Sequence, residues 1–198
     1  MLIHFGTRYP SQSVPLITIN NASVERVTSF KLLGVYFNNR LDWKDHVAHI
    51  TTKASKRIFC LHQLVRAGVD TKALTIVYCS LIRSVLEYCC QVWHSGLTQQ
   101  QSRDIEKIQK RCMRIIFPNS DYSDALRVSG LQTLSERRES LVKDLFNEIK
   151  SDTHPLNSLL RHRLNNVPTR NNYPFTLPKL TTDRARRDFI SYCLLKMC

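Results

Sequence analysis

The chain has 198 residues, of which 42% are hydrophobic and 23% charged, and its formal net charge is +13 at pH 7. These values predict one folded domain, or one domain with a tail, and exclude a chain too polar to bury a core. A surface this basic attracts polyanions, and nucleic acid is the polyanion expected first, although basic charge also serves solubility and attraction to membranes.

No targeting or membrane-spanning segment is expected. The apolar run at residues 1–5 is too short for the core of a signal peptide. The longest apolar stretch, residues 73–86, is interrupted by Thr75, Ser80 and Arg83, so we expect no membrane partner. Seven cysteines, an odd number, predict free thiols in a reducing compartment and therefore an intracellular protein, cytoplasmic or nuclear.

The first 37 residues read as short β-strands. Strands are expected at residues 2–5, 16–19, 24–27 and 30–37, with a turn at Asn20-Asn21. Such small pieces cannot form a stable domain unless they pack on something else.

A first helix is predicted from Asp42, which can cap it, with Asp45 three residues later offering a second carboxylate to the free amides. Gly68 is expected to end it. The apolar positions that repeat at three- and four-residue spacing are Val47, Ile50, Ala54, Ile58, Leu61 and Val65.

A second helix is predicted to start at Asp70 or Thr71 and to close at residues 94–96. Its apolar positions cover most of the circumference, so we expect it to be buried on most sides at the centre of a bundle. These positions are Leu74, Val77, Tyr78, Leu81, Ile82, Val85, Tyr88, Cys89 and Val92.

A third helix, from about residue 98 to 117, has one apolar face and one basic face, and Pro118 stops it. The apolar face holds Ile105, Ile108, Cys112, Ile115 and Ile116. The basic face holds Arg103, Lys107, Lys110, Arg111 and Arg114, which we call the basic stripe. No acidic residue is expected to pair with these cations on their own face, so the stripe indicates contact with nucleic-acid phosphates over a merely solvated surface.

Two more helices are predicted, a short one at residues 121–128 ended by Gly130, and one at residues 134–149. After Ser151 the pattern becomes basic and rich in loops. Residues 188–197 are consistent with either a strand or a helix. The sequence favours neither phosphate contact nor simple solvation for three arginines of this tail, Arg184, Arg186 and Arg187.

Other candidate sites have competing structural explanations. Lys53, Lys56 and Arg57 flank the apolar stripe of the first helix, where phosphate contact and simple solvation of a bundle edge are equally consistent. Tyr36, Phe37 and Trp43 could stack on bases, but packing at the strand–helix junction is favoured.

We expect no metal site. Cys89-Cys90 with His94, and Cys60 with His62, lack the spacing of zinc ligands. Helix capping explains Asp42 and Asp45 beside His46 without acid–base chemistry. No phosphate-binding glycine loop or Ser-His-Asp arrangement can be recognised.

Several blocks in order resemble the passage from palm to thumb in reverse transcriptases of non-LTR retrotransposons (LINE, jockey-like). The resemblance begins at residues 30–50, FKLLGVYFNNRLDWKDHVAHI, and covers roughly residues 1–150. It continues through residues 81–88 (LIRSVLEY), Val92-Trp93, residues 105–111 (IEKIQKR), Gly130-Leu131, Leu134 and residues 136–138 (ERR).

This resemblance implies a right-hand polymerase that holds an RNA or RNA–DNA template–primer. Leu33, Gly34 and Val35 would form the primer-grip hairpin. The implied fold is mostly α. Residues 1–40 would be a palm remnant, 41–118 a thumb-like helical bundle, 119–150 a helical continuation and 151–198 an irregular basic tail. The parent enzyme would use Mg²⁺ ions held by catalytic aspartates. This chain has no adjacent aspartate pair, so we expect no cofactor and no polymerase activity from it without an upstream polymerase portion.

The function expected first is therefore the thumb region of an RNA-directed DNA polymerase. The alternatives are a helical module that binds an acidic protein, or a non-functional remnant of a retroelement. An independent enzyme is the weakest alternative.

Overall fold

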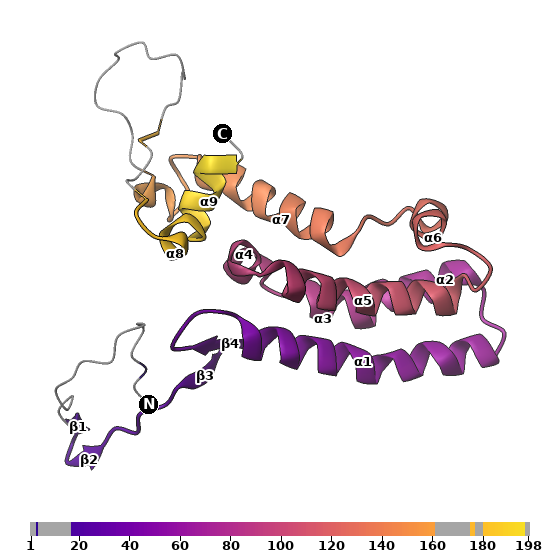
Figure 1. The fold of residues 1–198 in the computed structure, drawn as a ribbon, viewed down its shortest axis with the longest axis horizontal. Helices are drawn as coiled ribbons and strands as arrows, with labels where there is room; N and C mark the ends of the chain where they lie inside the picture. Colours follow the sequence, from indigo (N-terminus) through magenta and orange to yellow (C-terminus); the bar gives the residue numbers. More distant parts are fainter. Residues whose placement is uncertain (1–2, 4–16, 161–174, 177–179, 197–198) are drawn as a thin grey trace, which may run out of the picture.

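The computed structural model describes residue 3 and residues 17–160, 175–176 and 180–196. Within these ranges the chain is mostly α-helical, with two small antiparallel sheets of two strands each near its N-terminal end, as predicted. The three long helices are α1 (Lys44–Arg66), α5 (Gln99–Ile116) and α7 (Leu134–Ile149). They lie in successive layers, with α5 packed against both α1 and α7 (Figure 1).

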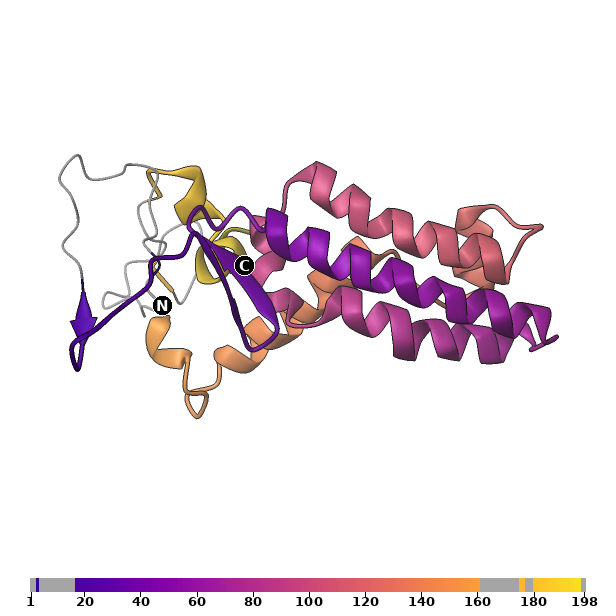
Figure 2. The same cartoon turned by 90° about the horizontal axis from the view of Figure 1, so that it is seen from below.

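The first sheet is a small hairpin away from the bundle (Figure 2). It pairs β1 (Thr18–Ile19) with β2 (Ala22–Ser23) around the predicted Asn20-Asn21 turn, where both residues have positive φ. Residues 24–27 form no strand, so that prediction is wrong; the two-residue strands of this hairpin already end at Ser23. The segment predicted at residues 2–5 falls outside the described residues except for Ile3.

The second sheet is a tight hairpin where one strand was predicted. Strand β3 (Ser29–Leu32) pairs with β4 (Val35–Asn38), so that Leu32 faces Val35. The chain reverses at Leu33-Gly34, where φ is 45° and 88°. Two consecutive positive φ values define the hairpin turn that matches strand twist, and glycine adopts them without a steric penalty. The sequence resemblance implied such a hairpin; the periodicity alone did not.

Helix α1 begins one residue later than predicted. Its N-cap is Trp43, with a φ of 61°, and no side chain caps it. Asp42 lies one residue outside, where its carboxylate accepts hydrogen bonds from the Lys44 backbone N–H (3.1 Å) and from Asn38 Nδ2 (2.7 Å). Through these two hydrogen bonds Asp42 connects the end of β4 to the start of α1.

The apolar face of α1 is buried as predicted, except at its last position. Val47, Ile50, Ala54, Ile58 and Leu61 are at most 5% exposed. Val65 is 40% exposed, because it lies in the last turn of the helix at the end of the bundle. Gly68, with a φ of 76°, follows the helix and donates its N–H to Val65 O (3.0 Å), which confirms the predicted end.

The predicted second helix is interrupted. It consists of α2 (Thr71–Val77), the π-helical turn η1 (Tyr78–Arg83), α3 (Ser84–Glu87), α4 (Cys90–Trp93) and the 3₁₀ turn η2 (His94–Gly96). Asp70 caps α2 as predicted, accepting hydrogen bonds from the backbone N–H groups of Lys72 and Ala73. The break lies at Cys89, whose φ is 51°.

A four-residue repeat of buried side chains explains the π-helical turn η1, which is wider than a turn of an α-helix. As far as Cys90, the side chains that this segment buries are Leu74, Tyr78, Ile82, Leu86 and Cys90. Around an ideal α-helix such a repeat drifts by about 40° per step, since each residue turns the chain by about 100°. The π-helical turn takes up part of this drift and keeps the side chains directed at the core.

The second segment is not buried on most sides, contrary to the prediction. Leu81, Tyr88 and Val92 are 40–50% exposed, and Ile76 is 68% exposed. Among the described residues, the stretch Thr71–Gly96 is long and apolar enough to pass as a membrane span by length and composition alone. This is weak evidence, because core helices of bundles have the same length and composition.

The remaining predicted helices are confirmed. Helix α5 starts at a capping box formed by Thr98 and Gln101. Helix α6 (Tyr122–Ser129) ends at Gly130, and α7 starts at a second capping box, formed by Thr133 and Glu136.

The tail contains helices as well as loops. A 3₁₀ turn, η3 (Asn157–Leu159), and the short helix α8 (Asp183–Arg186) precede α9 (Phe189–Lys196), which resolves the open choice at residues 188–197 in favour of a helix. Cys193 and Leu194 of α9 pack with Val142, Phe146 and Ile149 of α7 in a second, smaller core.

Candidate nucleic-acid interface

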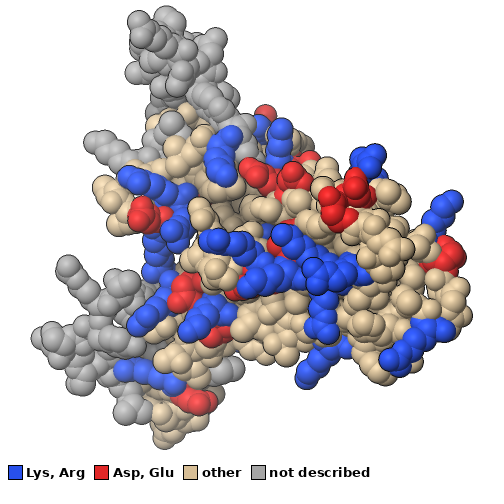
Figure 3. Space-filling model, turned by 45° about the vertical axis from the view of Figure 1, so that its right-hand side comes forward, with Lys and Arg blue, Asp and Glu red and all other residues tan. Residues whose placement is uncertain are grey.

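The basic stripe lies on one fully exposed face of α5. All five of its side chains are exposed, while Ile105, Cys112, Met113 and Ile116 on the opposite face are buried. Figure 3 shows Lys and Arg side chains gathered in a band across the middle of the molecule, where α5 lies. The stripe is about 16 Å long, the length of about five phosphate spacings along one nucleic-acid strand.

A buried polar network fixes the rotation of α5. Gln109 is 0% exposed and accepts a hydrogen bond from the Tyr78 hydroxyl. Its amide donates to the Tyr122 hydroxyl (2.9 Å) and to Gln132 O (2.9 Å). Because turning α5 would leave these buried groups unpaired, the network holds the basic stripe toward solvent.

One cation of the stripe has an acidic partner, which corrects the expectation that none would. Lys107 Nζ lies 2.8 Å from Asp104 Oδ1, and this hydrogen bond is the main cause of a lowered pKa at Asp104. The pair is exposed and therefore worth only about 0.2–1 kcal/mol. Lys107 can exchange this partner for a phosphate at little cost in free energy.

The other cations of the stripe are held less tightly. Lys110 Nζ lies 5.1 Å above the centre of the Tyr122 ring, and Arg103 donates to Gln99 O (3.3 Å). Arg111 and Arg114 form no ion pair or side-chain hydrogen bond with any residue in the described ranges. Their charges are available to a ligand.

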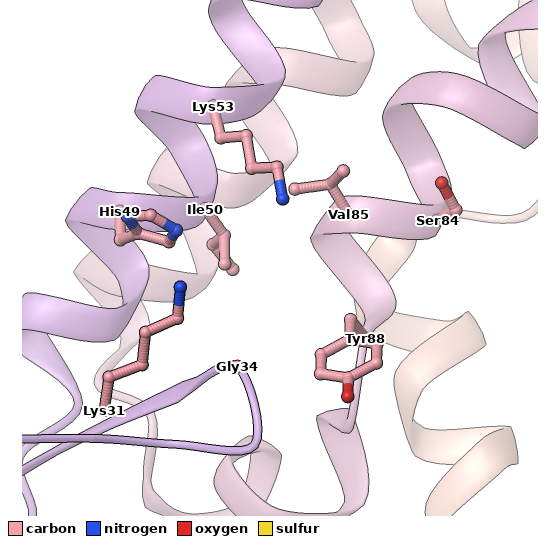
Figure 4. A pocket seen from close by; sticks show the side chains of 8 residues that line it. All are labelled: Lys31, Gly34, His49, Ile50, Lys53, Ser84, Val85 and Tyr88. Carbon is pink, nitrogen blue, oxygen red and sulfur yellow. The ribbon is translucent and has the colours of Figure 1, made fainter.

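The second predicted group, on α1, does not join this surface. Lys53 and Lys56 are exposed, whereas Arg57 is half-buried and donates a hydrogen bond to Leu81 O in η1. Lys53 likewise points toward α3 (Figure 4). Helices α3 and α5 lie on different sides of α1, so the two groups face different directions (Figure 2).

Lys53 instead meets the hairpin at a small cavity, which we call the hairpin pocket. Its volume is about 220 Å³, and its walls come from the β3–β4 hairpin, α1 and α3. Figure 4 shows the nitrogen atoms of Lys31, His49 and Lys53 directed into this space, with Tyr88 on the far side and Gly34 at the turn between them. The remaining lining residues are Ile50, Ser84 and Val85.

The hairpin pocket is electropositive. Burial lowers the pKa of His49, and the nearby charges of Lys31 and Lys53 lower it further. The Tyr36 ring lies 4.7 Å from the His49 ring and 5.6 Å from Lys31 Nζ, which positions both groups. A bound anion would be stabilised by both lysines, and would favour protonation of His49.

The three hairpin residues named from the resemblance have three different environments. Leu33 is 84% exposed at the tip, and its carbonyl accepts a hydrogen bond from the Tyr88 hydroxyl (3.0 Å). Gly34 lines the hairpin pocket, where a β-carbon would lie 3.0 Å from the Tyr88 ring. Val35 is buried in the main core.

Sequence reasoning missed Lys31, His49 and Tyr88. The four-residue spacing of His49 and Lys53 places them on one face of α1, and that signal could have been used. Lys31 could not have been found without the register that places it opposite Tyr36. Tyr88 was assigned to the core because it fitted an apolar periodicity.

The aromatic residues at the junction pack as favoured. Phe37 lies between Phe30 and Trp43, with ring centres 5.6 and 5.5 Å away. Tyr36 packs on His49. These contacts leave the hairpin fixed to the start of α1.

The candidate metal residues do not converge. His46 is buried, with Nδ1 accepting from the Tyr36 N–H (3.4 Å), whereas Asp42 and Asp45 bind Asn38. Over the described parts of the chain no three His, Cys, Asp or Glu side chains gather as metal ligands, and the six described cysteines are unpaired.

Fold and site together define a helical bundle with a small hairpin at one end and two electropositive surfaces. Over 105 residues, or 52% of its length, the chain is 24% identical to a retrovirus-related Pol polyprotein from the type-1 retrotransposable element R1 of Bradysia coprophila. The match spans only 10% of that polyprotein. This similarity supports a retrotransposon-related origin. No protein-family profile and no solved structure matches the chain.

Proposed function

We propose that this chain is a thumb region of a non-LTR reverse transcriptase and that it holds the backbone of an RNA or RNA–DNA template–primer. The observation that carries the proposal is the basic stripe, five exposed cations on the face of α5 opposite its buried residues. The similarity to a retrotransposon Pol polyprotein supports the polymerase context. Polymerisation itself would need the rest of such an enzyme, including its Mg²⁺-binding aspartates.

The stripe binds phosphates without reading bases. Lysine and arginine that track a backbone give an affinity that falls with salt, since each phosphate contact releases condensed counterions. Cations spaced along one helix face over about five phosphate spacings suit contact with the backbone, which carries no sequence information. The expected binding is therefore independent of sequence.

Substitution of the stripe tests the proposal. Changing Lys107, Lys110, Arg111 and Arg114 to alanine should reduce the dependence of log affinity on log salt by about 3.6 units for duplex ligands, or about 0.9 units for each lost contact. The measurement is fluorescence anisotropy of a labelled RNA–DNA duplex at several salt concentrations.

A control with the same loss of charge uses exposed cations on other helices. Lys72, Arg127, Lys143 and Arg186 changed together to alanine should leave most of the salt dependence intact. Equal effects of the two quadruple variants would show that net charge alone, and not the stripe, binds the duplex.

The hairpin pocket would hold one phosphate of the strand next to the hairpin. In this role Lys31 and Lys53 supply charge, and His49 adds a donor when protonated. Because a bound phosphate raises the pKa of His49, affinity should increase as pH falls from about 8 to 6.

The pH dependence checks the role of the pocket. In the wild-type chain the affinity should rise several-fold over this range at constant salt, and in His49→Gln the rise should largely disappear. His62→Gln, at an exposed position of the same helix, is the matched control. A rise that survives in His49→Gln would rule out the pocket as the source.

A further inference from the structure

A larger cavity lies beside the connection between β4 and α1, and we call it the arginine pocket. Its volume is about 770 Å³, within the range of pockets that hold cofactors and small ligands. Its walls come from the connection between β4 and α1, from α4 and α7, and from the tail at α8 and α9.

Three arginines line the arginine pocket. Arg40 comes from the β4–α1 connection, and Arg184 and Arg187 from the tail; all three are exposed. Among the described residues none of the three guanidinium groups forms an ion pair. Two carboxylates, of Asp42 and Asp188, also line it. The carboxylate of Asp42 is held by Asn38 and the Lys44 N–H, and that of Asp188 accepts from the Ser191 N–H at 3.5 Å.

Apart from Gln91 and Thr98, the other side chains that line the arginine pocket are apolar. Val92 and Leu156 are 47% and 42% exposed there, and Leu41, Leu145 and Phe189 add further apolar surface. Apolar side chains left open beside three exposed arginines suit a ligand with a flat apolar body and an anionic group. Guanidinium groups bind phosphate through paired hydrogen bonds and stack on planar rings, which together favour a nucleotide.

The backbone around the arginine pocket is also unusual. Leu41 and Trp43 both have positive φ, 52° and 61°, on either side of Asp42. Left-handed backbone at bulky residues is energetically unfavourable, and such strain clusters at functional sites. Here it directs the Leu41 and Trp43 side chains into the wall of the cavity.

We infer that the arginine pocket binds a single nucleotide, with the base against the apolar wall and the phosphate on the arginines. This site is separate from the basic stripe and does not depend on it. It would capture one unpaired nucleotide at a strand end, in contrast to the duplex backbone that the stripe contacts.

Tryptophan fluorescence reports directly on the arginine pocket. The chain has two tryptophans, of which Trp43 lines the cavity and Trp93 is 0% exposed. Adenosine 5′-monophosphate should change the emission saturably, with half-saturation below about 1 mM, and adenosine or inorganic phosphate should bind at least about tenfold more weakly. Calorimetry on Trp43→Phe shows whether binding persists when the signal is removed.

The variants separate this site from the stripe. Arg40, Arg184 and Arg187 changed together to alanine should weaken nucleotide binding about tenfold or more, whereas the control Arg127, Lys143 and Arg186 to alanine should not. The quadruple stripe variant should bind adenosine 5′-monophosphate as the wild type does. No saturation by 5 mM, an unchanged affinity in the arginine variant, or equal binding of octanoate would overturn the inference.

Discussion

Gly96 lies directly against the indole of Trp43. A β-carbon at Gly96 would be 2.2 Å from Trp43 Nε1, which is far inside van der Waals contact. Trp43 is 8% exposed and packs on Phe37, so it cannot move aside without breaking the junction between the hairpin and α1. The last residue of η2, three positions before α5, is thus required to be glycine for a steric reason.

Gly96→Ala should therefore lower the free energy of unfolding by about 2–3 kcal/mol, as overpacking of a close-packed site does. Urea denaturation followed by circular dichroism measures the loss. Gly68→Ala is the control, because it introduces backbone strain at a φ of 76° with no atom within 4 Å. If Gly96→Ala proves no more destabilising than Gly68→Ala, the indole is not packed as described.

The roles of single residues could be predicted where those roles depend only on neighbouring residues in the chain. The cap at Asp70 and the helix end at Gly130 follow from short-range rules and were found from sequence. Arg138 is the opposite case. It is 0% exposed, donates to Ser102 Oγ (3.0 Å) and lies 5.8 Å from the Trp93 ring centre, and no local pattern marks a buried arginine.

At the scale of elements, the first residue of the β3–β4 turn, Leu33, is of a type that does not suit its backbone conformation. Leu33 has a φ of 45° and is 84% exposed, so its side chain is neither conformationally suited nor buried. An exposed apolar residue in strained backbone is more readily explained by a contact with a ligand or partner than by stability.

Leu33→Asn should raise the free energy of unfolding by about 0.5–1 kcal/mol, because asparagine accepts left-handed backbone and Asn-Gly is the favoured pair in this turn. Thermal unfolding measures the gain. The same substitution at the exposed strand residue Leu32 serves as the control and should give no gain. A destabilised Leu33→Asn would mean that the Leu33 side chain contributes to the fold.

Helices were easier to predict than their irregularities. The ends of α5, α6 and α7 follow from capping residues and periodicity. The π-helical turn and the break at Cys89 were missed because an apolar residue at every fourth position fits a smooth helix almost as well.

The candidate site was predictable on α5, where one helix carries all its residues. The hairpin pocket was not, because it combines Lys31, Gly34, His49 and Tyr88 from three elements.

At the scale of the whole molecule, two histidines make the fold sensitive to acid. Burial is the main cause of a pKa of about 4 for both His46 and His94, below the ordinary value of 6.5. The unfolded chain therefore binds protons at these residues between pH 6.5 and 4, while the folded chain does not. Stability falls as pH decreases through this window and is unaffected by these groups above it.

The expected loss is up to about 1.4 kcal/mol per pH unit for each histidine inside the window. Urea denaturation at pH 7.5 and at pH 5 should show a clear decrease for the wild type. His46→Gln should reduce the difference between the two pH values, and His62→Gln, at an exposed position of α1, should not. A stability that is the same at pH 7.5 and 5 would contradict neutral burial of these histidines.

The wide turn Tyr78–Arg83 also sets how this chain tolerates changes in length. It accommodates an extra residue within an otherwise continuous helix, so losing one residue there would restore ordinary helical geometry with little local penalty. The segments on either side would keep their buried faces toward the core, whereas losing one residue from α3 would turn Tyr88 by about 100° and shift it by about 1.5 Å. Tyr88 would leave Gly34 and Leu33 O, and the hairpin would lose its contact with α3. The length of the chain between the wide turn and Tyr88 is therefore fixed, and a one-residue deletion in α3 would open the hairpin pocket, whereas one in the wide turn would not.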